Sequence, residues 1–366
     1  MKASEIFARG SFAALACCAL LAVCPSDKVH ACTGITLTAQ DQTHVLARSI
    51  EWGASRLDSR LIVSGSRRSI QTETAQGPGM RYETKYGFVG VSIFKDAYVV
   101  EGINEKGLSA GLFFFPGYGR YPEYQAEERS RTISDMEFVT WMLSTFDSVD
   151  ALRKAAPSIR LAAAIAQAGT LHYRAADADG AQIVIEVTDG LVKIYDNPLG
   201  VLTNSPDFPW QMTNLNNYLN LRTGPTTAVD WGKVKLSQFG MGAGLLGLPG
   251  DISPSSRFVR AAFLQSTAPA LKAARQAVVY AFTILNSFDI PIGLELSGAS
   301  EETELTSATQ WTSAADTTHR VFYYRTALNS RIRSVDLTKI DFSRPRFDSF
   351  PLENLTQQPF EALPIR

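Results

Sequence analysis

The chain has 366 residues and a formal net charge of −1 at pH 7, with 45% hydrophobic and 19% charged residues. This composition is typical of a globular core, and the absence of any block of like charges argues against nucleic acid or a membrane surface as partner. No internal repeat, low-complexity tract or Pro/Gly/Ser linker divides the sequence, which predicts one compact domain.

Residues 1–31 have the pattern of a secretory signal peptide. Lys2 and Arg9 give a basic start, and residues 11–23 form an uninterrupted apolar run. A spanning helix needs roughly 20 such residues, whereas the apolar region of a signal peptide has about 7–15. "VHA" then supplies a cleavage pattern that ends at Ala31. We expect cleavage before Cys32 and export to the periplasm or the medium, which leaves residues 32–366 as a single domain.

The cysteine count gives Cys32 a special position. Cys17, Cys18 and Cys24 all lie in the segment expected to be removed. A mature chain with one cysteine forms no internal disulfide, so this thiol is a candidate reactive group. The same position also fits a non-catalytic lipoprotein, in which Cys32 carries a lipid anchor and the protein binds amphiphiles. Polar residues between the apolar run and Cys32 disfavour that alternative.

The elements after Cys32 are strands first and then a mixture of strands and helices. Strands are expected at residues 34–39, 43–52, 60–66, 87–94, 97–103 and 109–115. A helix is expected over 134–146, because Ser134 and Glu137 match the capping box S-x-x-E. A second strand series follows at 169–198, with Asp179-Gly180 and Asp189-Gly190 as its turns.

The second half of the chain completes this alternation. Helices are expected at 255–265 and 271–288, and strands return at 309–337. The order β, α, β, α, β favours an α+β layered sandwich.

An N-terminal cysteine would carry a nucleophile and a base in one residue. Its thiol attacks a carbonyl, and its α-amine, with an ordinary pKa near 8, accepts the thiol proton. Arg48 and Glu51 lie on the second strand of the first hairpin, which brings them back beside Cys32. An odd spacing places them on opposite faces of a regular strand, so a bulge or the strand end must intervene if both serve one site. An ion pair at a sheet edge is the alternative.

Several blocks of this sequence resemble the choloylglycine hydrolase / penicillin V acylase family. These blocks are "CTGITL", "ARSIEWG", "GINEKGLSAGL…FPGYG", "VLTNSPDFPWQMTNLNNY" and "GLPGDISPSSRFVRAAF", in the family's order. The resemblance implies an N-terminal-nucleophile hydrolase with an αββα four-layer sandwich. Members cleave linear amides such as conjugated bile salts, penicillin V and acyl-homoserine lactones.

The resemblance also implies roles for single residues. Cys32 matches the nucleophile, and Arg48 matches the arginine that favours the ionised thiol. Glu51 stands where the family has an aspartate that holds the N-terminal amine. Asn204 matches an oxyanion donor, although "NSP" is also ordinary turn chemistry. Arg257 matches an arginine of the polar network around the nucleophile.

The resemblance implies one further site residue, and the position in a helix gives expectations for two arginines. The second oxyanion donor is a backbone N–H, which falls on Phe114; bile salt hydrolases tend to have asparagine there and penicillin acylases tyrosine. Arg257 lies in the first turn of a helix, where a cation is unfavourable without a partner. Arg260, one turn later, is expected to face solvent.

The aromatic loop at residues 113–124 is a candidate wall of the substrate pocket. Pockets are mostly apolar, and Phe113, Phe115 and Tyr118 would suit a bulky acyl group. The same rings could equally pack as an ordinary core strand.

The remaining features predict no cofactor and no metal. His44, His172 and His319 are scattered and lack ligand spacing, and there is neither a phosphate loop nor a dinucleotide fingerprint. A Cys32–His dyad stays open but is not needed. The expected partner is an amphipathic small-molecule amide. Conjugated bile salts are the first choice, and penicillin V or acyl-homoserine lactones the second. By family resemblance we also expect a homotetramer.

Overall fold

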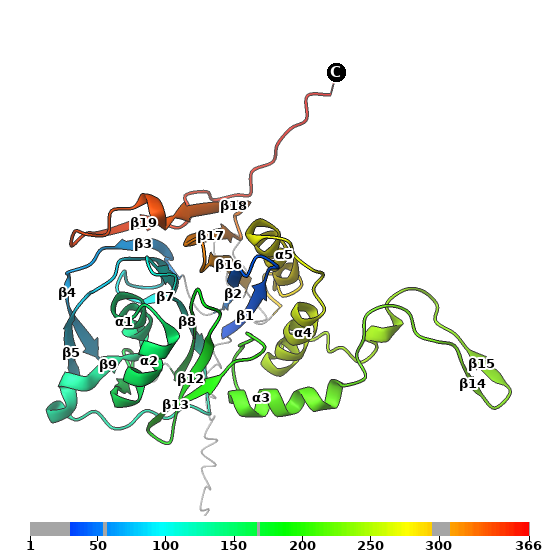
Figure 1. Cartoon of the computed structure of the whole chain (residues 1–366), viewed down its shortest axis with the longest axis horizontal. Helices are drawn as coiled ribbons and strands as arrows, with labels where there is room; N and C mark the ends of the chain where they lie inside the picture. Colours follow the sequence, from blue (N-terminus) through cyan, green and yellow to red (C-terminus); the bar gives the residue numbers. More distant parts are fainter. Residues whose placement is uncertain (1–29, 54–56, 167–168, 295–307, 366) are drawn as a thin grey trace, which may run out of the picture.

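The computed structural model describes residues 30–53, 57–166, 169–294 and 308–365 (Figure 1). Most of the predicted signal segment lies outside these residues. His30 and Ala31 lie within them and begin the first strand.

The first sheet has five strands in the order β1-β2-β16-β17-β18. They span β1 His30–Thr38, β2 His44–Trp52, β16 Ala308–Asp316, β17 Val321–Thr326 and β18 Asn329–Asp336. β1 and β2 form the expected hairpin, in which Cys32 pairs with Ile50 and Gly34 with Arg48. The first and last thirds of the chain therefore meet in one sheet, and Cys32 lies on its edge strand.

The second sheet has eight strands in the order β13-β12-β11-β8-β7-β6-β3-β19. They span β3 Arg60–Ser64, β6 Phe88–Ser92, β7 Val99–Asn104, β8 Ser109–Phe114, β11 Leu171–Ala176, β12 Gln182–Thr188, β13 Leu191–Asp196 and β19 Phe347–Pro351. Asp189 and Gly190 connect β12 to β13, and both have positive φ, 55° and 75°. A two-residue turn with that geometry matches the right-handed twist of the strands, as the Asp-Gly signal predicted.

Helices cover the outer face of each sheet (Figure 1). α1 (Phe138–Thr145) packs on β7 and β8, and α2 (Val149–Ala155) follows it in the chain after a short loop. α4 (Pro254–Ser266) and α5 (Ala274–Asn286) pack on β1 and β2. The result is the expected αββα sandwich, because each sheet buries one face on the other sheet and one on helices.

The expected capping box at the first helix does not form. Ser134 makes no side-chain cap hydrogen bond. Glu137 instead accepts the backbone N–H of Glu73 at 2.9 Å, so it ties the helix start to a neighbouring hairpin. Tertiary contact has replaced the local cap.

Smaller elements complete the chain. They are β4 Ser69–Thr74, β5 Gly77–Glu83, β9 Thr132–Ser134, β10 Arg160–Ala162, α3 Phe208–Asn214, β14 Val229–Trp231 and β15 Val234–Leu236. Short 3₁₀ turns span Ala126–Arg131, Asp135–Glu137, Ala156–Ser158, Leu215–Tyr218, Ala243–Leu245 and Leu337–Lys339. The β14–β15 hairpin lies at the tip of an arm, residues 219–253, that projects from the body between the Leu215–Tyr218 turn and α4 (Figure 1). Within the described ranges, no helix is long and apolar enough to cross a membrane.

Candidate active site

Cys32 lies near the start of β1, with its side chain buried between the two sheets. Arg48 Nη2 lies 2.7 Å from Cys32 Sγ. Arg48 also donates from Nη1 to the carbonyl of Leu112 at 2.7 Å, on the facing sheet. Since Cys32 pairs with Ile50 and Gly34 with Arg48, both side chains share the inner face of the hairpin. Regular strand pairing alone therefore places the guanidinium of Arg48 beside the thiol of Cys32.

Opposing effects act on the ionisation of the thiol. Burial raises the pKa of Cys32 and is the largest effect. The positive charges of Arg48 and Arg257 lower this pKa, and so does a hydrogen bond from the backbone of Phe114. The carboxylate of Glu51 raises it further. In this buried state the net shift is upward, so the arginines offset only part of the cost of burying a thiolate.

Glu51 lies on the other face of β2 from Arg48. It pairs with Ala31, and the β1–β2 register is regular along the whole hairpin, without the bulge that would bring both side chains to one face. The Glu51 carboxylate is buried and accepts a hydrogen bond from Thr309 Oγ1 at 3.3 Å. The charge of Glu51 therefore acts on Cys32 from the face of the sheet that the helices cover, where Glu51 lies beside Ala31.

Asn204 connects the nitrogen of Cys32 to the end of β8. Its Oδ1 accepts the Cys32 N–H at 3.0 Å and Arg257 Nη2 at 2.7 Å. Its Nδ2 donates to the carbonyl of Phe114 at 2.8 Å. Two donors face Oδ1 and an acceptor faces Nδ2, so the orientation of the amide is fixed by its partners.

Arg257 joins helix α4 to β1 and to Asn204. Nη1 donates to the carbonyl of Cys32 and, at 3.0 Å, to Thr33 Oγ1, while Nε donates to the carbonyl of Ile252 at 2.8 Å. These acceptors compensate a buried cation in the first turn of a helix, as the sequence suggested.

Arg260 does not face solvent as expected. It is buried, donates to the carbonyls of Pro249 and Asp251, and lies over the ring of Phe288. The loop before α4 folds back over the helix, and helical spacing gave no sign of this.

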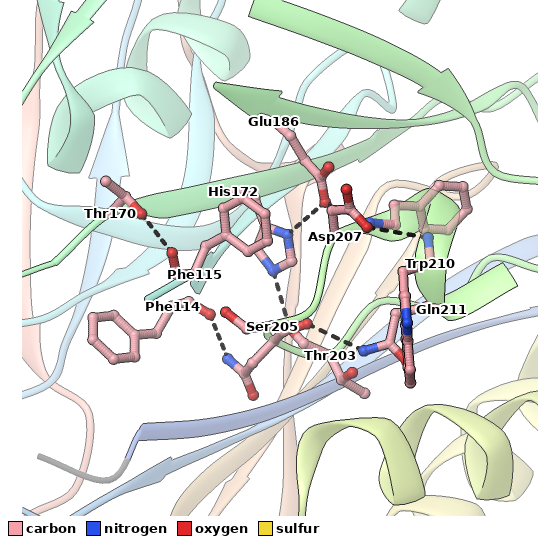
Figure 2. Close-up of polar contacts among 12 residues, drawn as sticks. Phe114, Phe115, Thr170, His172, Glu186, Thr203, Ser205, Asp207, Trp210 and Gln211 are labelled. Carbon is pink, nitrogen blue, oxygen red and sulfur yellow. Dashed lines mark hydrogen bonds and ion pairs between the residues drawn. The ribbon is translucent and has the colours of Figure 1, made fainter. Parts of the chain in front are cut away.

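The Asn204 loop rests on a buried histidine and glutamate (Figure 2). His172 Nε2 lies 3.2 Å from the carbonyl of Thr203, and Nδ1 lies 3.2 Å from Glu186 Oε1. Gln211 Nε2 reaches the carbonyl of Asn204 at 3.4 Å. These contacts hold the chain on both sides of Asn204, so they fix where its side chain lies.

The three histidines named above all make their hydrogen bonds away from the thiol. His172 contacts Glu186 and Thr203, while His44 Nδ1 lies 2.9 Å from Thr38 Oγ1 and His319 Nδ1 lies 2.9 Å from Asp316 Oδ2. None of these contacts forms the Cys32–His dyad that the sequence left open.

The aromatic loop is divided between core and surface. Phe113 and Phe115 are fully buried: Phe113 lies under the guanidinium of Arg48 at 4.3 Å, and Phe115 stacks on His172 at 4.4 Å. As placed here these two rings are core side chains that support the site rather than a substrate wall. Phe114 is partly exposed and Tyr118 is 49% exposed, so these two can meet a ligand.

Two charged residues near the site were missed from the sequence. Glu101 and Arg174 are both buried, and Glu101 contacts Arg48 and Arg174. A signal was present, because each is the only Asp, Glu, Lys or Arg in a strand that is mostly apolar, "VVEGI" and "LHYRAA". Buried charges in such places need partners.

No group of three or more His, Cys, Asp or Glu residues suited to a metal ion occurs within the described part of the chain.

The four-layer sandwich and the buried polar network around Cys32 define the class as an N-terminal-nucleophile hydrolase fold. Residues 32–350 match the family model of linear amide C–N hydrolases, choloylglycine hydrolase family. The chain belongs to that family, and it is therefore a linear amide hydrolase.

Named relatives of the chain act on bile salts. It is 30% identical over 316 residues to a bile salt hydrolase/transferase of Clostridium perfringens, covering 84% of this chain and 93% of the relative. It is 35% identical over 279 residues to a bile salt hydrolase/transferase of Lactiplantibacillus plantarum, covering 74% and 84%. A crystal structure of a variant conjugated bile acid hydrolase from C. perfringens superposes with a TM-score of 0.78 at 27% identity, covering 90% of this chain and 99% of the other.

Proposed function

We propose that this protein hydrolyses the amide bond of conjugated bile salts, with Cys32 as an N-terminal nucleophile. The observation that carries the proposal is the position of the thiol. Arg48 Nη2 lies 2.7 Å from Sγ, and Asn204 contacts both the Cys32 nitrogen and the end of β8. A nucleophile, a group that stabilises its anion and an oxyanion donor thus meet at one point.

Maturation would remove residues 1–31 and free the α-amine. The family match begins at Cys32, in agreement with a cut at that bond. In the uncut chain the Cys32 nitrogen is a peptide amide that donates to Asn204. Ala31 pairs with Glu51, so its removal would clear the space beside the carboxylate. Glu51 would then hold the new α-amine. The signal pattern of residues 1–31 supports cleavage during export to the periplasm or the medium.

The reaction would proceed through an acyl-enzyme. The thiol proton passes to the α-amine as Sγ bonds to the amide carbon. Asn204 Nδ2 and the Phe114 N–H donate to the oxygen that becomes negative. The C–N bond breaks as the ammonium returns its proton to the leaving amine. Water, deprotonated by the α-amine, then attacks the thioester, so the free acid leaves and the thiol is restored.

The substrate would be an amphipathic amide with a bulky apolar acyl group. The relatives named above act on bile salts. Phe114, whose backbone contacts Cys32 and Asn204, is partly exposed, and Tyr118, whose ring lies 6.0 Å from that of Phe115, is exposed. The steroid would pack on these rings, and glycine or taurine would be the leaving amine. Penicillin V and acyl-homoserine lactones are the competing substrates.

The arm supports a proposal of self-association into a homotetramer. Its exposed apolar side chains include Leu219, Trp231, Phe239, Met241 and Leu246. Large apolar side chains exposed on a projecting hairpin are typical of a surface that another molecule covers. A second copy of this protein is the proposed occupant.

Release of glycine from glycocholate tests the function, with penicillin V and an acyl-homoserine lactone assayed in parallel. We expect glycocholate to be turned over fastest and Cys32→Ser to lose several orders of magnitude in rate with unchanged thermal stability. Turnover near the wild-type rate by Cys32→Ser would remove the nucleophile assignment. Faster cleavage of another amide by the wild type would reassign the substrate. If the wild type binds glycocholate but cleaves none of the three substrates, the result would favour a non-catalytic lipoprotein that binds amphiphiles.

A further inference from the structure

A buried row of charges lies directly behind the arginine that contacts the thiol. Arg174 Nη2 is 3.0 Å from Glu101 Oε1, and Arg48 Nη1 is 3.5 Å from Glu101 Oε2. All three side chains are at most 3% exposed. The row ends at Cys32, because Arg48 Nη2 lies 2.7 Å from Sγ.

Strand pairing aligns this row across the facing sheets. In the eight-stranded sheet Arg174 on β11 pairs with Gly111 on β8, and Gly111 pairs with Glu101 on β7. A Cβ on Gly111 would overlap the Glu101 carboxylate. The Arg174–Glu101 ion pair therefore spans Gly111, and only glycine, which has no Cβ, leaves room for it there.

The five-stranded sheet makes matching room. A Cβ on Gly34, which pairs with Arg48, would lie 2.7 Å from Arg174 Nη1. Arg174 Nη1 also donates to the carbonyl of Ile35 at 3.1 Å. Arg174 thus touches both the cysteine strand and Glu101, and Phe113 lies against both guanidinium groups, at 4.3 Å from Arg48 and 5.4 Å from Arg174.

The charges in this row decide how much of the Arg48 charge reaches the thiol. In a buried site a carboxylate beside Arg48 would neutralise it, and the thiol would then lose its counter-charge. Arg174 supplies a second cation to Glu101 at a shorter distance than Arg48 does. With Glu101 paired mainly to Arg174, the charge of Arg48 is left to the thiolate.

We propose that Glu101 and Arg174 are positioning residues that set the charge Arg48 presents to Cys32, with Arg174 neutralising Glu101 so that Arg48 can stabilise the thiolate. This inference rests on the proposed role of Cys32 as nucleophile. It is independent of which amide is the substrate.

The other charged groups that face the thiol stay constant in the test. They are Glu51 on β2 and Arg257 on α4, together with the backbone hydrogen bond from Phe114 at the end of β8. Burial is the largest influence on Arg174 and lowers its pKa. The charge of Glu101 raises that pKa, the charge of Arg48 lowers it, and the negative charge of the Cys32 thiolate adds a smaller raising effect. The coupling is reciprocal, so Arg174 stabilises the thiolate.

The experiment titrates the single thiol of the mature chain by its ultraviolet thiolate absorbance. Each variant is measured against the same variant carrying Cys32→Ser, so tyrosine ionisation cancels. Arg174→Met should raise the thiol pKa and Glu101→Gln should lower it, each by about one unit, which is about tenfold in thiolate at a fixed pH below the pKa. The thiol pKa of the double variant should lie near the wild-type value. Arg174→Lys keeps the positive charge, so its thiol pKa should lie much closer to the wild-type value than that of Arg174→Met.

Matched controls separate this role from a structural one. Arg344→Met removes an exposed arginine and should leave the titration unchanged. Shifts of the same sign in Arg174→Met and Glu101→Gln, or no shift in either, would overturn the inference. If Arg174→Met does not fold, Glu101→Gln and Arg174→Lys still decide, because Glu101→Gln must lower the pKa. Glycocholate hydrolysis by the same proteins tells the two proposals apart. An inactive Cys32→Ser with unshifted titrations would leave the function standing and remove only this inference.

Discussion

Asn204 is the residue on which the site geometry depends most. Its amide oxygen takes two donors, Cys32 N and Arg257 Nη2, and its amide nitrogen reaches Phe114. Sequence reasoning identified it only through the family resemblance, since Asn-Ser-Pro is also a turn. A local bend and a role in the site are compatible for this residue. Asn204 lies in a bend of the chain with Ser205 and Pro206, and this bend presents its side chain to Cys32.

Removing the Asn204 amide should slow chemistry more than binding. We expect Asn204→Ala to lower kcat by about 10²–10³-fold with little change in KM, because an oxyanion donor acts chiefly in the transition state. Steady-state hydrolysis of glycocholate measures this. Asn216→Ala, at an exposed position in the 3₁₀ turn after α3, is the matched control and should behave as wild type. A large rise in KM with unchanged kcat would assign Asn204 to ground-state binding instead.

At the scale of elements, the sequence predicted best where local chemistry and burial agree. The β1–β2 hairpin, the Asp-Gly turn before β13 and helices α4 and α5 all formed as expected. Errors arose where a distant segment intervened. Glu137 left its capping box for the backbone of Glu73, and Arg260 was buried by the loop at Pro249 and Asp251. The small strands β14 and β15 were also missed, because their apolar side chains face solvent in the isolated chain.

How well the site could be predicted also depends on how far apart its residues lie in the chain. Pairing within one hairpin brings Arg48 to Cys32, and a sequence can suggest that. The Glu101–Arg174 bridge depends on the alignment of β7, β8 and β11 and on their stacking against β1. Such contacts join residues far apart in the chain, so periodicity within one strand carries no information about them.

The arm offers a test at the element scale. The backbone N–H of Arg222 donates to the carbonyl of Gly244 at 3.1 Å, so the arm closes at its base and can be removed there. Replacing residues 225–242 with a short Gly-Ser turn should reduce a tetramer to smaller species, and Trp231→Ser should weaken it. Lys233→Ser, at the hairpin turn, should have no effect. Light scattering coupled to gel filtration gives the mass. A tetramer that survives the deletion would place the interface elsewhere.

On the scale of the whole molecule, the proposed chemistry depends on one peptide bond, the bond between Ala31 and Cys32. The four layers place Cys32 on an edge strand, between the sheets, with Asn204 and Arg257 approaching from later parts of the chain. In the uncut chain the nitrogen of Cys32 is still part of a peptide bond. The site becomes a self-sufficient catalyst only when the bond between Ala31 and Cys32 is cut, since the α-amine is the proposed base.

The most direct test of the central claim is the intact mass and N-terminal sequence of the protein exported by a bacterial host. The account predicts a chain that begins at Cys32, with a free amine and an unmodified thiol. A lipid-modified Cys32, or a chain that begins several residues away from it, would leave no base beside the thiol and would contradict the N-terminal-nucleophile mechanism.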